Sequence, residues 1–236
     1  CCLLRHTEGR YQVHKPDETS TTFEQIAALV DSSPTPVRLH PSQGLVLVAP
    51  FDGIGGARRA IEILGLTPAL YIGIDHDEAC HLVIEGAWPE AVLLKNVNEI
   101  TEAVLADLLR EVADLDTGLI AAGPPCPSFS NLNNDRRGVD DPRSGGIAMY
   151  VRIVTMLNKV APQIEWSSMM QNVASMSDEH RATITERVSD IHGHRLPYWF
   201  DAAQIGHVNR PRLYLDELGF GRKGLGVQIP EECRSG

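Results

Sequence analysis

The sequence lacks the features of a membrane-spanning chain, of a disulfide-stapled scaffold and of a repeat protein. No apolar run approaches the roughly 18 residues needed to cross a bilayer. Cysteine is scarce: the five cysteines form no CxxC pair and have no zinc-type spacing to histidine, so no metal site is expected. This pattern excludes a small secreted framework and indicates a reducing intracellular compartment, where a functional cysteine acts as a thiol. No repeat with a period of about 20 to 50 residues is present.

Positive charge is also scarce. Lysine and arginine number 21 against 31 aspartate and glutamate, which gives a formal net charge of −10. A uniformly basic nucleic-acid-binding surface is therefore excluded, although a local basic cleft is compatible with this balance. Residues 1–10 also lack the charged-then-apolar order of a secretory signal. The 236 residues, with 20 glycines and 15 prolines, fit one globular domain with an appendage.

The N-terminal part of the chain differs from the rest in its pattern of polar and apolar residues. We expect residues 1–44 to form an appendage and residues 45–236 to form the main domain. Residues 23–30 place apolar side chains at helical spacing and predict a short helix. Residues 33–42 contain three prolines and predict a linker into the main domain.

From residue 44 onward, short apolar runs alternate with stretches of helical periodicity. Strands are expected at residues 45–48, 69–74, 91–94 and 117–122, at a run that ends near 170, and near 198 and 213. Helices are expected at residues 57–64, 78–85, 102–112, 147–159 and 180–191. This alternation predicts an α/β fold with a doubly wound, mostly parallel sheet, in which ligands bind at the carboxyl ends of the strands.

A glycine-rich turn follows the first of these strands, Phe51-Asp52-Gly53-Ile54-Gly55-Gly56. Glycine allows a backbone to turn tightly and to approach a ligand without a Cβ in the way. The turn is not a phosphate-binding P-loop, because no Gly-Lys-Ser/Thr follows, and it is not a regular GxGxxG. Taken alone, it fits either a nucleotide-like cofactor or a tight strand–helix connection.

An aspartate ends the next strand. Asp75 lies 22 positions after Gly53, close to the spacing at which a carboxylate accepts both hydroxyls of a ribose. The alternative is that Asp75 caps the following helix, a position that aspartate also favours. Together the two motifs favour an adenosine-bearing cofactor, either NAD or S-adenosylmethionine.

A cysteine follows the fourth strand. Cys126 comes directly after Gly123-Pro124-Pro125, on a turn stiffened by two prolines at the expected cofactor edge. The next loop is polar and locally basic, with Ser128, Ser130, Asn131, Arg136 and Arg137. Such a loop can close over a substrate and supply phosphate contacts, or it can be a solvated connection.

Four motifs now occur in a family-specific order. They are the glycine turn 51–56, Gly123-Pro124-Pro125-Cys126-Pro127-Ser128-Phe129-Ser130, Gln171-Asn172-Val173 and Asn209-Arg210-Pro211-Arg212. Over residues 45–220 the chain resembles the C5-cytosine DNA methyltransferases, and its spacing and tail are most similar to the animal de novo enzymes. The resemblance implies a Rossmann-like methyltransferase fold, S-adenosylmethionine as cofactor and DNA as substrate.

The resemblance also implies roles for individual residues. Cys126 would add to C6 of a cytosine flipped out of the duplex, which makes C5 nucleophilic. Gln171 would contact N3, and Arg210 and Arg212 would hold the base and its backbone. The implied cofactor-binding residues are Phe51, Asp52, Gly53, Ile54, Gly55, Gly56, Asp75, His76, Asn96, Val97 and Pro124. The implied DNA-binding residues are Ser128, Ser130, Asn131, Arg136 and Arg137.

Three departures from the family pattern affect these expectations. Gln171 replaces a glutamate, so it can donate a hydrogen bond but no proton, and we expect slow turnover. Asn96 stands where the family has an aspartate that binds the adenine amino group, and it serves either that contact or a loop turn. Residues 213–236 are too few for a target-recognition region and a closing segment, so poor sequence specificity and an open cofactor pocket are expected. In a permuted arrangement, residues 23–30 would instead supply the missing element.

Three rival interpretations stay open. In the first, the chain is a catalytically impaired, regulatory homologue that holds cofactor, a partner methyltransferase subunit or a second copy of itself. In the second, it is a cytosine-5 methyltransferase of tRNA. In the third, it is a nicotinamide-dependent oxidoreductase, an interpretation that gives Cys126 no reason for its position. The expected compartment is the nucleus in a eukaryote and the cytoplasm otherwise.

Overall fold

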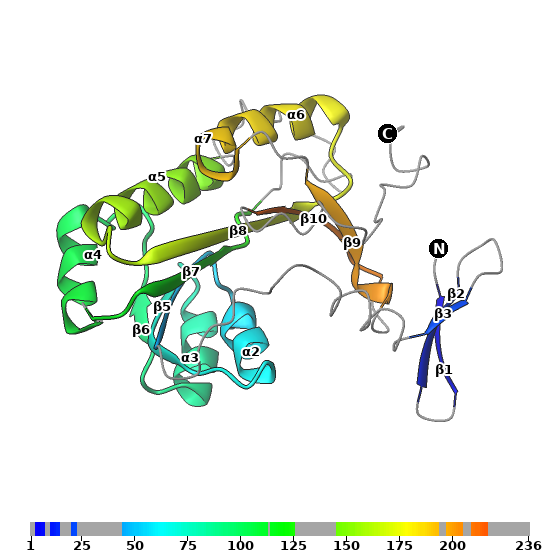
Figure 1. Ribbon diagram of the computed structural model, residues 1–236, viewed down its shortest axis with the longest axis horizontal. Helices are drawn as coiled ribbons and strands as arrows, with labels where there is room; N and C mark the ends of the chain where they lie inside the picture. Colours follow the sequence, from blue (N-terminus) through cyan, green and yellow to red (C-terminus); the bar gives the residue numbers. More distant parts are fainter. Residues whose placement is uncertain are drawn as a thin grey trace.

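The computed structural model describes residues 3–7, 10–14, 20–22, 44–112, 114–125, 145–193, 197–204 and 209–216. Its strands are β1 (Leu3–Thr7), β2 (Arg10–His14), β3 (Ser20–Thr22), β4 (Leu45–Pro50), β5 (Pro68–Ile74), β6 (Val92–Leu94), β7 (Thr117–Ala122), β8 (Glu165–Val173), β9 (Tyr198–Asp201) and β10 (Pro211–Asp216). Its α-helices are α2 (Gly56–Ile63), α3 (Glu78–Ala87), α4 (Glu102–Leu109), α5 (Gly145–Val160), α6 (Asp178–Arg187) and α7 (Ser189–His192). Two short 3₁₀ turns follow α4 and β9 (Figure 1).

The main sheet has seven strands in the order β6-β5-β4-β7-β8-β10-β9. The first five of these strands run parallel, and β10 is inserted antiparallel between β8 and β9. The chain builds outward from β4 through β5 to β6 and then returns to the other side of β4 as β7. The expected doubly wound, mostly parallel sheet is confirmed, and its topological switch point lies between β4 and β7.

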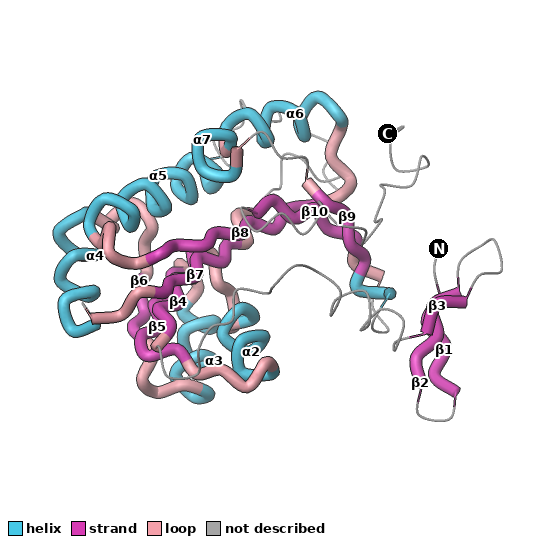
Figure 2. The backbone as a smooth tube through the Cα atoms, in the orientation of Figure 1, coloured by secondary structure: helices cyan, strands magenta, loops and turns pink. Residues whose placement is uncertain are grey.

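The central strand β4 shows why this sequence builds a sheet covered on both faces. All six residues of β4 are buried, as a continuous apolar run in a parallel sheet requires. Val46 and Val48 pack into the larger core with α4, α5 and α6, whereas Leu45 and Leu47 pack with residues of α2 and α3. Accordingly, α2 and α3 lie on one side of the sheet and α4 to α7 on the other (Figures 1 and 2).

Most predicted elements of the main domain are found close to their expected bounds. The predicted helix 102–112 ends as an α-helix at Leu109 and finishes in a 3₁₀ turn. The predicted helix 180–191 is two helices, because α6 ends at Arg187 and α7 begins at Ser189. None of the helices in the described parts of the chain combines the length and the hydropathy that a bilayer crossing needs.

The N-terminal segment differs from its prediction. Residues 3–22 contain an antiparallel three-stranded sheet in the order β1-β2-β3, although no strand was expected in this segment. The strand β3 consists of Ser20, Thr21 and Thr22, and two of these residues are β-branched and fit a pleated backbone. The predicted helix 23–30 and the predicted linker 33–42 lie outside the described residues.

Candidate functional site

The glycine turn has the left-handed backbone that its sequence requires. Phe51, Gly53 and Gly55 all have positive φ, at 58°, 61° and 82°. A Cβ on Gly55 would lie 2.5 Å from Cζ3 of Trp88, so packing as well as conformation demands glycine there. Around the corresponding positions of Gly53 and Gly56 nothing lies within 4 Å. The turn is therefore fixed on its Trp88 side and open along Gly53 and Gly56.

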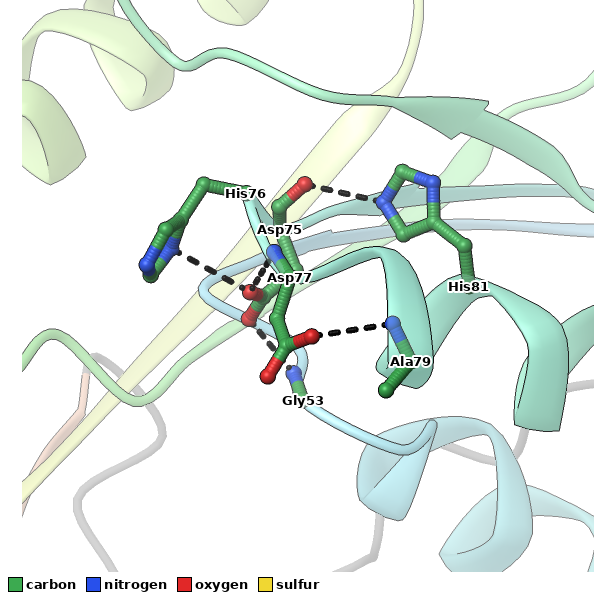
Figure 3. A network of polar contacts seen from close by, with 6 residues as sticks. All are labelled: Gly53, Asp75, His76, Asp77, Ala79 and His81. Carbon is green, nitrogen blue, oxygen red and sulfur yellow. Dashed lines mark hydrogen bonds and ion pairs between the residues drawn. The ribbon is translucent and has the colours of Figure 1, made fainter.

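Asp75 joins the end of β5 to this turn (Figure 3). The backbone N–H of Gly53 donates to Oδ2 of Asp75 over 2.9 Å, and that of Asp77 donates to Oδ1 over 3.0 Å. The ring of His81 donates from Nε2 to the carbonyl oxygen of Asp75 over 2.8 Å. One aspartate thus ties the turn after β4 to the turn after β5. Each carboxylate oxygen keeps further acceptor capacity, because an ionised carboxylate offers about four lone-pair sites.

The helix cap of α3 is a different aspartate. Asp77 occupies the N-cap position and accepts the N–H of Ala79 over 2.9 Å. The alternative prediction, that Asp75 caps this helix, is therefore wrong. The neighbouring His76 lies in solvent, with 91% of its side chain exposed and Nδ1 3.4 Å from Oδ1 of Asp75 (Figure 3).

Asp52 is held by an aromatic residue that the sequence motifs did not reveal. The hydroxyl of Tyr71 donates to Oδ2 of Asp52 beneath the glycine turn, and Trp88 packs edge-on against the Tyr71 ring. Burial raises the pKa of Asp52 to about 6, with a further increase from the negative charge of Asp75 and an opposing decrease from the Tyr71 hydrogen bond. Burial also raises the pKa of Tyr71, so it remains a hydrogen-bond donor. No spacing in the sequence indicated Tyr71 or Trp88 as parts of this site.

The loop after β6 uses its asparagine for its own turn. The amide nitrogen of Asn96 donates to Oε1 of Glu99 over 3.1 Å, and its oxygen accepts the N–H of Asn98 over 2.9 Å. This geometry matches the loop-turn interpretation of Asn96. The carbonyl of the next residue, Val97, accepts a hydrogen bond from Nη2 of Arg152 over 2.9 Å. Sequence reasoning did not find Arg152, because it lies far along the chain on α5.

The proline turn lies next to the glycine turn. A Cβ on Gly146, at the start of α5, would lie 3.1 Å from Cβ of Pro124, 3.3 Å from Cδ of Pro125 and 3.5 Å from Cζ of Phe51. The turns after β4 and β7 therefore meet at the first turn of α5, at the switch point of the sheet. Cys126 and the loop residues Ser128, Ser130, Asn131, Arg136 and Arg137 lie outside the described residues.

Two further predicted residues lie on adjacent strands of the same sheet. Gln171 in β8 pairs with Tyr214 in β10, and Val173 pairs with Arg212 in the same ladder. Because residues two apart on a strand share a face, Gln171 and Arg212 lie on one face at a diagonal position. Arg210 precedes β10 and is exposed, with its backbone N–H donating to Asp201 over 2.7 Å. The strands that carry Gln171 and Arg212 are separated by β7 from β4, the strand that leads into the glycine turn.

Comparisons with known sequences find one family model and relatives that match this chain. The family model described as C-5 cytosine-specific DNA methylase matches residues 48–193. The type II methyltransferase M.AquIA of Picosynechococcus is 28% identical over 129 residues, which cover 51% of this chain and 50% of that protein. The DNA (cytosine-5)-methyltransferase DRM2 of rice is 24% identical over 117 residues, which cover 47% of this chain and 19% of that protein. The chain thus spans half or less of the length of these relatives.

Solved structures share the fold. A crystal structure of a prophage-encoded DNA modification methyltransferase from E. coli aligns with a TM-score of 0.55 and 17% identity, over 73% of this chain and 46% of that one. The methyltransferase EhMeth of Entamoeba histolytica aligns with a TM-score of 0.50 and 19% identity, over 74% of this chain and 52% of that one. These likenesses confirm the Rossmann-like methyltransferase fold. With its family model matched over more than half of its residues, the chain belongs to the C-5 cytosine-specific DNA methylase family.

Proposed function

We propose that this chain is a DNA (cytosine-5)-methyltransferase that methylates C5 of a flipped cytosine through a covalent adduct with Cys126. The observation that carries the proposal is the meeting of the glycine turn and the Gly123-Pro124-Pro125 turn at the switch point. Phe51 and Pro125, the residue preceding Cys126, both pack against Gly146 in the first turn of α5. The spacing and the tail 209–214 support the finer proposal of the animal de novo subgroup, although the two relatives come from a bacterium and from rice.

The residues of the glycine turn fit S-adenosylmethionine. Gly53 and Gly56 leave the backbone open, and Asp75 keeps lone pairs for hydroxyl donors beyond its two backbone hydrogen bonds. The remaining proposed cofactor contacts are Phe51, Asp52, Ile54, Gly55, His76, Asn96, Val97 and Pro124. The chemistry that the cofactor supplies when bound is a methyl group made electrophilic by a sulfonium. Asp52 and Asp75 give the site negative charge, which suits a cationic ligand.

Cys126 provides the covalent step. Its thiolate forms an S–C6 bond and moves the ring electrons toward C5, which then takes the methyl group. Removal of the C5 proton by a base allows the S–C6 bond to break and restores the aromatic ring. A free thiol is only a few per cent ionised at neutral pH, so its turn must favour the thiolate. The base must leave the duplex first, at a cost of a few kcal/mol, because its C6 face is otherwise stacked.

Gln171 and the arginines act on the flipped base in this proposal. The Gln171 amide donates a hydrogen bond to N3, and Arg210 and Arg212 hold the base and its phosphate. Gln171 and Arg212 lie on one face of neighbouring strands, which supports a shared role. Because an amide delivers no proton, methyl transfer at this site should be slow. The second candidate function is therefore a catalytically impaired homologue with regulatory partners.

The proposed DNA contacts lie in the polar loop that follows Cys126, within the main domain. We propose residues 45–236 as a catalytic domain and residues 1–44 as an appendage. Ser128, Ser130, Asn131, Arg136 and Arg137 would contact phosphate. With so few cationic side chains and a net charge of −10, DNA binding should be weak and salt-sensitive.

The enzyme would work in the nucleus of a eukaryotic cell, or otherwise in the cytoplasm.

Covalent trapping tests this function. Duplex DNA containing 5-fluorocytosine is incubated with the protein and S-adenosylmethionine. The fluorine blocks the final elimination, so a denaturation-resistant adduct is expected with the wild type and none with Cys126→Ser. The same assay on tRNA separates an RNA enzyme from a DNA enzyme. An adduct that survives Cys126→Ser, or none on either nucleic acid, would contradict the assignment of Cys126 as an active nucleophile.

A further inference from the structure

Arg152 joins α5 to the loop between β6 and α4 by hydrogen bonds to the backbone of that loop. It lies in the middle of α5, and its Nη2 donates to the carbonyl oxygens of Val97 over 2.9 Å and Ile100 over 2.8 Å. The carbonyl oxygen of Asn98 lies 3.5 Å from the same nitrogen. One half-buried guanidinium group therefore holds three carbonyls of the loop between β6 and α4.

Two N–H groups of the loop have acceptors within the loop itself. Asn98 N–H donates to the Asn96 side chain, and Glu99 N–H donates to the Asn96 carbonyl over 3.1 Å. This internal turn directs the carbonyls of residues 97, 98 and 100 toward α5. Hydrogen bonds from a charged donor are stronger than those between neutral groups, so Arg152 restrains this loop from outside, as does the exposed pair of Lys95 with Glu78 over 2.9 Å.

The same helix also contacts the other half of the site. The first turn of α5 packs through Gly146 against Pro124, Pro125 and Phe51. Arg152 lies seven positions after Gly145, where α5 begins, in the interior of the helix. One rigid element thus contacts both the turn that leads to Cys126 and the loop that carries Asn96 and Val97.

We propose that Arg152 is a positioning residue that fixes the loop of residues 95–101 in its cofactor-binding conformation. This inference rests on the proposed function, in which Asn96 and Val97 border the cofactor. Arg152 itself does not touch the cofactor in this proposal; it acts through the backbone of the loop. Its loss should weaken cofactor binding more than it slows methyl transfer at saturating cofactor.

An ion pair on the same helix provides the matched control. Lys159 of α5 pairs with Glu102 of α4 over 2.7 Å, and both side chains are largely exposed. This contact also joins α5 to the segment after the loop, but it reaches no carbonyl of residues 97–100. A variant that only loosens the packing of α5 on α4 is therefore Lys159→Ala.

The experiment compares Arg152→Ala, Arg152→Lys and Lys159→Ala in the full chain. Two readouts are used: amide hydrogen exchange of residues 96–101 without ligand, and the Kd for S-adenosylhomocysteine by calorimetry. Arg152→Ala should speed exchange in this loop and raise the Kd about tenfold, because a charge-assisted hydrogen-bond set is lost. Arg152→Lys keeps a cationic donor and should recover part of the affinity, whereas Lys159→Ala should leave both readouts unchanged.

The outcomes separate the two proposals. A wild-type protein without affinity for S-adenosylhomocysteine overturns the proposed function and this inference with it. A wild-type protein that binds, with unchanged exchange and Kd in a folded Arg152→Ala, overturns the inference alone. If Arg152→Ala does not fold, Arg152→Lys decides, since an unaltered Kd in that variant together with unaltered exchange contradicts the positioning role.

Discussion

The carboxylate of Asp75 accepts the backbone N–H of Gly53 over 2.9 Å, across the ends of two adjacent parallel strands. This contact gives a structural meaning to the 22-residue separation in the sequence. The chain needs that length to complete α2 and β5 and return to the same edge of the sheet. Asp75 therefore holds the glycine turn in place while it keeps lone pairs for a ligand.

Replacing Asp75 tests both roles. Asp75→Ala leaves the N–H groups of Gly53 and Asp77 without their acceptor, which should lower the free energy of unfolding by about 1–3 kcal/mol. For a domain of this size, that corresponds to a decrease of roughly 2–4 °C in Tm per kcal/mol. The affinity for S-adenosylhomocysteine, measured by calorimetry, should fall at the same time.

Asp77→Ala is the matched control for this prediction. It removes the N-cap of α3 at a cost of about 1 kcal/mol but leaves the Asp75 carboxylate and its backbone donors intact. Both variants should melt earlier, and only Asp75→Ala should lose affinity. Equal affinities in the two variants would show that Asp75 has a structural role alone.

The glycines of the turn should differ sharply in their tolerance of a methyl group. Gly55→Ala forces a left-handed conformation on alanine and places Cβ 2.5 Å from Trp88. It should lower the free energy of unfolding by more than about 2 kcal/mol, because both strain and overpacking oppose it. Gly86→Ala, on the exposed side of α3 with open space around it, should instead stabilise by about 0.5–1 kcal/mol. Chemical denaturation measures both, and equal stability of the two variants would contradict the Trp88 contact.

Asp52 should make stability depend on pH. The folded pKa of Asp52 is raised to about 6, above its ordinary value of 3.8, so the native state holds the proton more tightly than the unfolded state. The stability from this site is therefore complete below pH 3.8 and is lost as the pH rises through about 6. Asp52→Asn removes this titration and should gain about 2 kcal/mol on the wild type between pH 4 and pH 7.

Tyr71→Phe keeps the titration of the Asp52 carboxyl group but raises its pKa further. The Tyr71 hydroxyl lowers the pKa of Asp52, so its removal should move the pH at which stability is lost above pH 6. Thermal melts across the pH range measure both variants. A stability profile that is the same in wild type, Asp52→Asn and Tyr71→Phe would contradict the raised pKa.

The fold was predictable from the sequence because its signals are local. A strand such as β4 is a continuous apolar run, and each turn that follows a strand carries its own glycine, proline or aspartate. Parallel strands bring such turns to one edge, so the approach of the glycine turn to the proline turn followed from the topology. The small N-terminal sheet gave no such signal, since its strands are three to five residues long and mix polar with apolar side chains.

The partners of the site residues were not predictable in the same way. Tyr71 and Asp52 are 19 positions apart, and Arg152 and Val97 are 55 positions apart. Such contacts depend on the relative placement of packed elements, which no spacing rule encodes. Asn96 illustrates the limit, because an asparagine in a loop fits a ligand contact and an internal turn equally well until its neighbours are known.

Gln171→Glu is the most direct test of the chemistry. Glutamate restores a group that can pass a proton to N3, and general-acid help of this kind is typically worth about 10²–10⁴ in rate. We expect single-turnover methylation of duplex DNA, measured with enzyme in excess, to rise by at least about tenfold. The new carboxylate would lie on the same face of the sheet as Arg212, at the diagonal position of the ladder. Gln171→Leu, of similar size but without a donor, serves as the control and should fall below the wild type. A rate that stays flat or drops with glutamate, in a variant whose melting temperature matches the wild type, would remove Gln171 from the reaction.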